Sequence, residues 1–290
     1  MKKIRIGGVP EHFNFPWYVG ISSGRFTQVG LDIEWKDVPE GTGTMSKMLR
    51  ENTLDAAVIL TAGIAVDILK GNPARIMQGF VKSRLIWGIH TRPGFLWEGY
   101  QSLAKGRIAI SRKGSGSHFF PLMIADECKI DKEALQFVEI ATLEGAKNAF
   151  DENRADIFLW EKFMTEPLVQ AGSMNFSGEW IAPWSAFVLA VNEDFAQKNR
   201  RDIRNMQTTI NLLCRSWMAN KAAAAMVAEK FHLDKQEAQK WFEQTKWCTS
   251  QKIISSELAF MLDKLFHTGF INIPMNPKDI CSREALLLHL

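Results

Sequence analysis

The sequence predicts an α/β protein with two lobes, each built on a central sheet that is flanked by helices. Strand-like stretches alternate with helix-like stretches up to about residue 191, which is typical of mostly parallel sheets covered on both faces. Two loops of one type, Gly-Thr-Gly-Thr at residues 41–44 and Gly-Ser-Gly-Ser at residues 114–117, each follow a predicted strand and open a predicted helix. Asp55 and Asp156 each introduce a short apolar strand, so the second stretch repeats the organisation of the first.

The first stretch of the chain supplies its strands and helices in regular order. Gly30 and Gly71 each follow a helix-like segment, at the position where glycine commonly ends a helix. A Pro-Gly pair at residues 93–94 marks a turn, and we place a lobe boundary there. We expect strands at 3–9, 31–38, 56–60, 74–81 and 85–90, and helices at 17–28, 44–51 and 62–69.

The second stretch repeats this order, and the rest of the chain is helical. We expect strands at 108–111, 136–139, 156–160, 176–181 and 186–191, and helices at 117–128, 143–153 and 163–171. Apolar residues then recur at helical spacing in Ile203, Met206, Ile210, Leu213 and Trp217. Further helices are expected at 222–231, 235–245 and 257–266.

Composition and charge exclude several classes of function. A net charge of +3 without a dense Lys/Arg run argues against nucleic-acid binding. We interpret the basic group Lys198, Arg200, Arg201 and Arg204 as a solvated helix face rather than a phosphate-binding patch. No apolar run is long enough to cross a membrane. The start is too short and polar for a signal peptide, so we expect a cytoplasmic protein; a periplasmic or lipid-anchored location is the alternative if a native leader is missing.

The two glycine loops are the best candidates for ligand binding. Glycine lets the backbone approach a ligand closely, and free N–H groups at a helix start favour polar or anionic groups. Simple helix capping by the hydroxyl residues is the alternative interpretation. The candidate ligand-binding residues here are Gly41, Thr42, Gly43 and Thr44 in one loop, and Ser111, Gly116, Ser117 and His118 at the other.

Other candidates follow the ends of predicted strands. Phe13, Asn14 and Trp17 would line one wall and stack on a flat ligand, or else pack the first helix. Ligands bind beyond the carboxyl ends of strands in open α/β sheets, where Thr61, Trp160 and Glu161 would lie. Glu161 would accept a hydrogen bond from an amine or a protonated ring, or else cap a helix. Trp184 and Ser185 are expected at the rim.

Metal binding and catalysis have little support. His12, His90, His118 and Glu161 would together suit a transition metal, but no local spacing supports a site. The four cysteines lie far apart, as is typical of reduced thiols, and form no metal-ligand motif. We therefore predict no catalytic residue, no metal and no cofactor.

These motifs resemble the type 2 periplasmic-binding-protein fold, within the branch of aliphatic-sulfonate and nitrate binders that also contains the fungal pyrimidine-precursor synthases. The resemblance rests on Gly8, Val9 and Pro10 with the aromatic residues that follow, and on residues 20–26, 29–33, 40–44 and 55–61. A narrower set at residues 38–43, 87–90, 110–118 and 160–163 is similar to leaderless solute-binding-like proteins of yeasts and bacteria. The C-terminal helices match only in general character.

The resemblance implies two lobes, residues 1–91 with 191–290 and residues 92–190, which are joined by a two-strand hinge. These lobes would close on a small polar or planar ligand without catalysis. Because of Glu161, a planar nitrogen-containing ligand such as a pyrimidine fits better than a bare anion. One alternative is an enzyme of thiamine-pyrimidine precursor synthesis, although the cysteine-rich segment of that branch is missing here. Another is a cytoplasmic ligand sensor or partner-binding module. If a leader was removed, an ABC permease becomes the expected partner.

Overall fold

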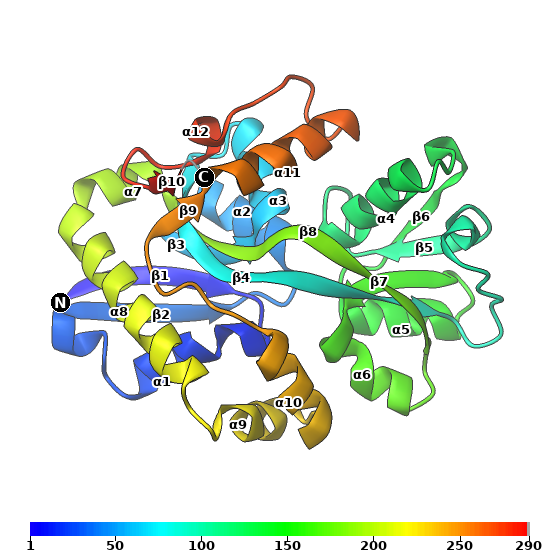
Figure 1. Cartoon of the computed structure of the whole chain (residues 1–290), viewed down its shortest axis with the longest axis horizontal. Coiled ribbons are helices and arrows are strands. Elements are labelled where there is room, and N and C mark those ends of the chain that lie inside the picture. The colour runs from blue at the N-terminus through cyan, green and yellow to red at the C-terminus, as the bar shows by residue number, and fades with distance from the viewer. Residues whose placement is uncertain (289–290) are drawn as a thin grey trace. The chain divides into compact units, whose positions relative to one another are not determined.

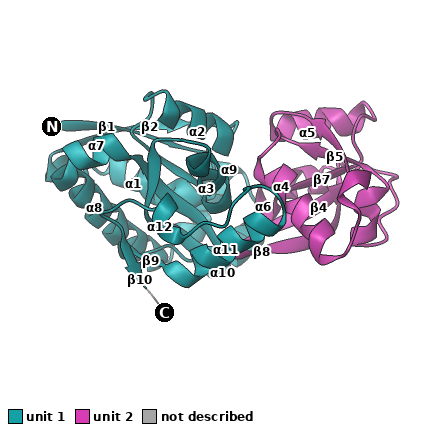
Figure 2. Cartoon of the chain, turned by 90° about the horizontal axis from the view of Figure 1, so that it is seen from above, with its two compact units in different colours: residues 1–84, 184–290 teal, residues 85–183 magenta. Residues whose placement is uncertain are grey.

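The computed structural model describes residues 1–288 (Figure 1). The chain forms two compact units, which Figure 2 shows in different colours. Unit 1 contains residues 1–84 and 184–290, and unit 2 contains residues 85–183. The sequence placed the boundaries later, at residues 91 and 191. The observed boundaries fall inside two long strands, β4 (Ala74–Thr91) and β8 (Asn175–Asn192), rather than at the Pro-Gly turn.

Unit 1 is built on parallel strands, each of which is followed by a helix. The strand β1 (Lys2–Gly8) pairs in parallel with both β2 (Leu31–Asp37) and β3 (Ala56–Leu60), and the last part of β8 runs antiparallel to β3. The helices of this part are α1 (Phe15–Ser22), α2 (Thr42–Arg50) and α3 (Thr61–Leu69). Helix α1 ends earlier than predicted because Gly24 has a positive φ of 68°, which interrupts the helix before a short 3₁₀ turn.

Unit 2 repeats this pattern of parallel strands, each of which is followed by a helix. The strand β5 (Arg107–Ile110) pairs in parallel with β6 (Gln136–Glu139) and β7 (Ile157–Glu161), and β4 runs antiparallel to β7. The helices are α4 (Gly116–Glu127), α5 (Leu143–Asp151) and α6 (Lys162–Gln170). Ala146, Ala149 and Phe150 of α5 pack against Ala109 and Phe158 of the sheet, forming part of the unit 2 core.

Strands β4 and β8 are each continuous over 18 residues, which corrects the prediction of two strands in each region. The prediction failed at β4 because a polar stretch, residues 82–84, resembles a turn. The structure keeps the strand because segment 246–248 pairs with it: Cys248 N–H donates to Phe80 O at 2.8 Å, and Lys82 N–H donates to Lys246 O at 2.9 Å.

The C-terminal part of unit 1 is helical, as the sequence predicts. Its helices are α7 (Glu193–Lys198), α8 (Arg200–Met218), α9 (Ala223–Phe231), α10 (Lys235–Gln244), α11 (Ser255–His267) and α12 (Pro277–Ile280), and a small parallel pair joins β9 (Lys252–Ile254) to β10 (Leu286–Leu288). Ile203, Met206, Ile210 and Trp217 of α8 are buried, and α8 packs against α1. Across residues 1–288, no helix has the length and apolar character needed to cross a membrane.

The two units share one arrangement of side chains, in which an aspartate at the start of a strand binds an arginine of the parallel neighbouring strand. In unit 1, the carboxylate of Asp55 accepts hydrogen bonds from the backbone N–H and the guanidinium of Arg5, the shortest at 2.6 Å. In unit 2, the carboxylate of Asp156 accepts from the backbone N–H and the guanidinium of Arg107, and also from Arg92. Each aspartate thus fixes the start of one strand to its parallel neighbour, which explains the sequence repeat at these two positions.

Candidate functional site

The first glycine loop opens helix α2. Gly41 has a φ of 78°, which favours glycine, and its carbonyl accepts the N–H of Met45 at 3.2 Å. The helix begins at Thr42, two residues earlier than predicted, so Gly43 and Thr44 lie in its first turn. The N–H groups of a first turn have no partner within their own helix, and they are therefore available to a ligand.

The second glycine loop opens helix α4 and is held by its own side chains. Gly114 has a φ of 79°, and its N–H donates to Nδ1 of His118 at 3.0 Å. The Ser117 hydroxyl accepts the N–H of Ser111 at 2.9 Å, which ties the end of β5 to the start of α4. Ser117 is almost fully buried, so its hydroxyl shapes the loop, and the first-turn N–H groups of Gly116 and Ser117 remain the ligand candidates.

His118 is held as a hydrogen-bond acceptor at one ring nitrogen. Because Nδ1 accepts from Gly114, the neutral ring carries its proton on Nε2. Burial lowers the pKa of His118, and the nearby Lys113 lowers it further. The ring also meets Phe137 edge-on at 4.7 Å between centroids. We expect His118 to be neutral at pH 7.

Glu161 caps a helix. Its Oε2 accepts the N–H of Met164 at 2.8 Å in the first turn of α6, and the side chain is buried. The sequence left ligand binding and helix capping equally open, and the structure shows the capping bond. The neighbouring Trp160 is half-buried and stacks on Phe158, with centroids 5.3 Å apart.

The aromatic wall expected after β1 belongs to the unit 1 core. Trp17 is fully buried between Phe26 and Trp35, so the expectation that it stacks on a ligand is corrected: no face of its indole is accessible. Phe13 packs against Phe187, and its carbonyl accepts Trp247 Nε1–H at 2.8 Å. These side chains therefore position α1 rather than line an open surface.

Asn14 and two of the histidines also lie in the interior of their units. Asn14 donates from Nδ2 to Val9 O at 2.7 Å in unit 1. His12 packs against Trp241 in unit 1, and Nε2 of His90 is bonded to the Thr165 hydroxyl at 2.8 Å in unit 2. Within residues 1–288, no three His, Cys, Asp or Glu side chains gather as a group that could hold a metal ion.

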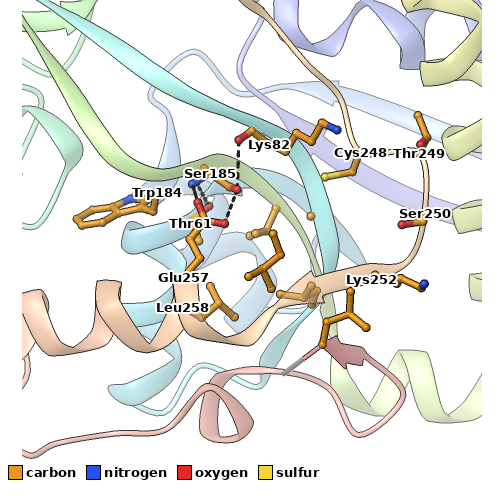
Figure 3. A pocket seen from close by; sticks show the side chains of 15 residues that line it. Thr61, Lys82, Trp184, Ser185, Cys248, Thr249, Ser250, Lys252, Glu257 and Leu258 are labelled. Carbon is orange, nitrogen blue, oxygen red and sulfur yellow. Dashed lines mark hydrogen bonds between the residues drawn. The ribbon is translucent and has the colours of Figure 1, made fainter. Parts of the chain in front are cut away.

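A cavity of about 220 Å³ in unit 1 brings Thr61 together with Trp184 and Ser185, which the sequence singled out as rim residues, and with Glu257, which it did not single out (Figure 3). The Thr61 hydroxyl donates to Ser185 O at 2.7 Å. The Glu257 carboxylate accepts the Ser185 hydroxyl at 2.8 Å and also the Ser185 N–H. Glu257 lies in the first turn of α11, 72 residues beyond Ser185, and no sequence motif links the two. These hydrogen bonds, which we call the clamp on Ser185, hold β8 at the point where the chain enters unit 1.

Replacing Glu11 with glutamine is expected to stabilise the protein at pH 8 and to change little at pH 4. Burial raises the pKa of Glu11 from an ordinary value of 4.5 to about 7. Between these values the unfolded chain is ionised while the folded protein keeps the proton, so the free energy of unfolding falls as pH rises from about 4.5 to about 7. Thermal midpoints measured from pH 4 to 8 test this prediction. The exposed Glu229→Gln is the control, and identical profiles for the parent and Glu11→Gln would contradict it.

Comparisons with known proteins identify the fold. A family model described as Ca3427-like PBP matches residues 96–180, all in unit 2. The structure is similar to the Candida albicans CA3427 gene product, described as defining a new family with the generic periplasmic binding protein fold; the TM-score is 0.88 at 21% identity, covering 100% of this chain and 99% of that chain. A search of curated protein sequences gave no match.

Two binding proteins of known structure share the architecture. The alkanesulfonate-binding protein SsuA from Xanthomonas axonopodis pv. citri, bound to MOPS, matches with a TM-score of 0.80 and 13% identity over 97% of this chain and 98% of that chain. The periplasmic nitrate-binding protein NrtA from Synechocystis PCC 6803 matches with a TM-score of 0.78 and 13% identity over 98% of this chain and 86% of that chain. The chain therefore has the two-lobed type 2 periplasmic-binding-protein fold, and the fold class and resemblance expected from the sequence are confirmed.

Proposed function

We propose that this protein binds a small polar or planar ligand and carries out no chemistry on it, in the manner of a solute-binding protein. The observation that carries the proposal is the repeated helix start: units 1 and 2 each present a glycine loop whose first-turn N–H groups lack intrahelical partners. The shared fold with sulfonate- and nitrate-binding proteins supports the same class of function. Ligand-induced closure of the two units stays a prediction.

The proposed ligand is planar and contains nitrogen. Trp160 offers a partly exposed indole for stacking, and aromatic contacts of this kind add about 0.5–1.5 kcal/mol beyond the area they bury. The Glu161 carboxylate next to it disfavours a bare anion such as sulfonate or nitrate. A pyrimidine-like ring, with hydrogen-bond donors for the carboxylate and a face for the indole, satisfies both neighbours.

Replacing Trp160 with alanine is expected to weaken ligand binding about tenfold, the equivalent of roughly 1.4 kcal/mol. A thermal-shift screen would first identify the ligand among sulfonates, nitrate, bicarbonate, thiamine pyrimidines, purines, flavins and pyridoxal phosphate, and calorimetry would then give the affinities. Trp97→Ala is the matched control, because Trp97 is also a half-buried tryptophan of unit 2 but lies outside the candidate site. Equal affinity of both variants for an identified ligand would remove Trp160 from the site.

The state of the cysteines supports binding over catalysis. Burial raises the pKa of Cys248 to about 11 and that of Cys281 to about 12, so both thiols stay protonated at neutral pH and are poor nucleophiles. Incubation with pyridoxal phosphate and iron tests the alternative of thiamine-pyrimidine synthesis. Formation of a pyrimidine product would overturn the non-catalytic proposal. A periplasmic location would make an ABC permease the natural partner, whereas the cytoplasmic location expected from the sequence favours a sensor role.

A further inference from the structure

A second cavity, of about 440 Å³, lies in unit 1 beside the start of α8 and the segment that follows α12. Three arginines line it, Arg200 and Arg204 of α8 and Arg283, together with the carboxylate of Glu284. Arg200 and Glu284 approach within 3.5 Å of each other. The lining therefore carries two more positive than negative charges. Arg200 and Arg204 are exposed, in agreement with the interpretation of a solvated helix face, and they also line this cavity.

Two of these arginines have guanidinium groups that a ligand could bind. Within residues 1–288, neither Arg204 nor Arg283 forms an ion pair or a side-chain hydrogen bond. A guanidinium presents a planar fork of donors that matches the oxygens of phosphate, and such bidentate bonds are among the stronger polar contacts in proteins. The surplus of two positive charges would balance the two negative charges of a phosphate monoester dianion.

Gln207 places an amide group in the same cavity. This residue lies one turn beyond Ile203 on α8, is only 5% exposed and lines the cavity. Its amide forms no hydrogen bond in the described part of the chain, and its polar atoms keep contact with solvent. The amide is therefore open to the cavity, where it can donate to and accept from a ligand hydroxyl.

The segment that carries Arg283 is fixed in place before any ligand arrives. Ser282 N–H donates to Ile76 O at 2.9 Å, and the Ser282 hydroxyl donates to Glu193 at 3.4 Å. Cys281 forms a parallel bridge with Ile76 of β4. The backbone of residue 283 is thus anchored to the sheet and to α7, which reduces the entropy lost when a ligand binds.

We propose that this cavity binds the phosphate monoester of a small hydroxylated molecule, at a site separate from the ligand site proposed above. Arg204 and Arg283 hold the phosphate, and Gln207 contacts a hydroxyl of the body. A volume of about 440 Å³ lies within the ordinary range for small-molecule sites and exceeds what inorganic phosphate alone would fill. Met77 and Ile203 supply apolar contact for the carbon skeleton.

Calorimetric titration of the full chain with ribose 5-phosphate tests the proposal, at an ionic strength held constant with chloride. Saturable binding is expected, with at least a tenfold loss of affinity in Arg204→Gln and Arg283→Gln. Arg201→Gln is the matched control, because Arg201 is exposed on the same helix and does not line the cavity. Ribose without the phosphate is expected not to bind.

Three results would overturn the proposal: no saturable heat at millimolar ribose 5-phosphate, an equal loss of affinity in Arg201→Gln, or binding of an acidic peptide in place of the phosphate ester. Inorganic phosphate titrated in parallel separates recognition of the anion alone from recognition of the whole ester; equal affinities would refute the role of Gln207. Trp160→Ala is expected to leave this binding unchanged, so failure here is distinguishable from failure of the proposed function.

Discussion

Replacing Trp17 with alanine should lower the free energy of unfolding by about 3–5 kcal/mol, the usual cost of truncating a buried tryptophan. Trp17 is fully buried, with its ring 5.3 Å from that of Phe26, 5.8 Å from that of Trp35 and 6.2 Å from that of Phe80. Its indole N–H has no hydrogen-bond partner in the described structure, so the loss is one of packing. These rings come from α1, β2, β4 and the loop between α1 and β2. The cavity left by the missing indole would therefore loosen several elements at once.

Calorimetric unfolding of the parent and the variant measures this effect. Phe260→Ala is the control, since Phe260 is an aromatic residue of unit 1 that is 45% exposed, and its loss should cost under 1 kcal/mol or so. A Trp17 variant as stable as the parent would mean that the indole does not fill the core. If this stable variant also lost ligand binding, the expectation that Trp17 lines a wall of the ligand site would be restored.

Replacing Asp156 with alanine should destabilise the protein by about 2–3 kcal/mol. Removing one partner of a buried ion pair costs roughly 3–5 kcal/mol, and we reduce this value because Arg92 and Arg107 are partly exposed. The variant leaves the Arg107 N–H and two guanidiniums without their acceptor, at the point where β7 joins β5. Asp151→Ala, which breaks an exposed pair with Lys147, should cost under about 0.5 kcal/mol.

The same carboxylate predicts a loss of stability in acid. Burial alone would raise the pKa of Asp156, but hydrogen bonds from Arg107 and Arg92 outweigh it and lower the pKa from 3.8 to about 2. A carboxyl whose pKa is depressed in the folded state stabilises the protein above its unfolded pKa, and this contribution disappears as pH falls from about 4 to about 2. Chemical denaturation at pH 7 and at pH 2.5 should therefore show a smaller difference between parent and Asp156→Ala in acid. An unchanged difference would contradict the ion-pair account.

The sequence predicted the local elements well because their signals are local. The strands at 56–60 and 136–139 begin and end where expected, and both glycine loops open helices. These features depend on residues within a few positions of one another, namely apolar alternation, a glycine of positive φ and a hydroxyl at the helix start.

The features that the sequence missed depend on distant partners. The burial of Trp17 requires Phe80, and the clamp on Ser185 requires Glu257 of α11. Strand β4 continues through a polar stretch only because segment 246–248 supplies backbone partners. Such pairings are set by the tertiary fold, so a local pattern cannot distinguish a turn from a strand, or a ligand wall from a core.

The division of the chain also has a consequence for synthesis on the ribosome. Unit 2 is one uninterrupted segment, whereas unit 1 needs residues from 184 onwards. Strand β3 receives its antiparallel neighbour only when Phe187–Val191 have been made. Until then one edge of the nascent unit 1 sheet is bare, and bare edges readily pair with other chains. The order of synthesis therefore favours completion of unit 2 first, and slow translation beyond residue 183 would prolong the period in which nascent chains can aggregate.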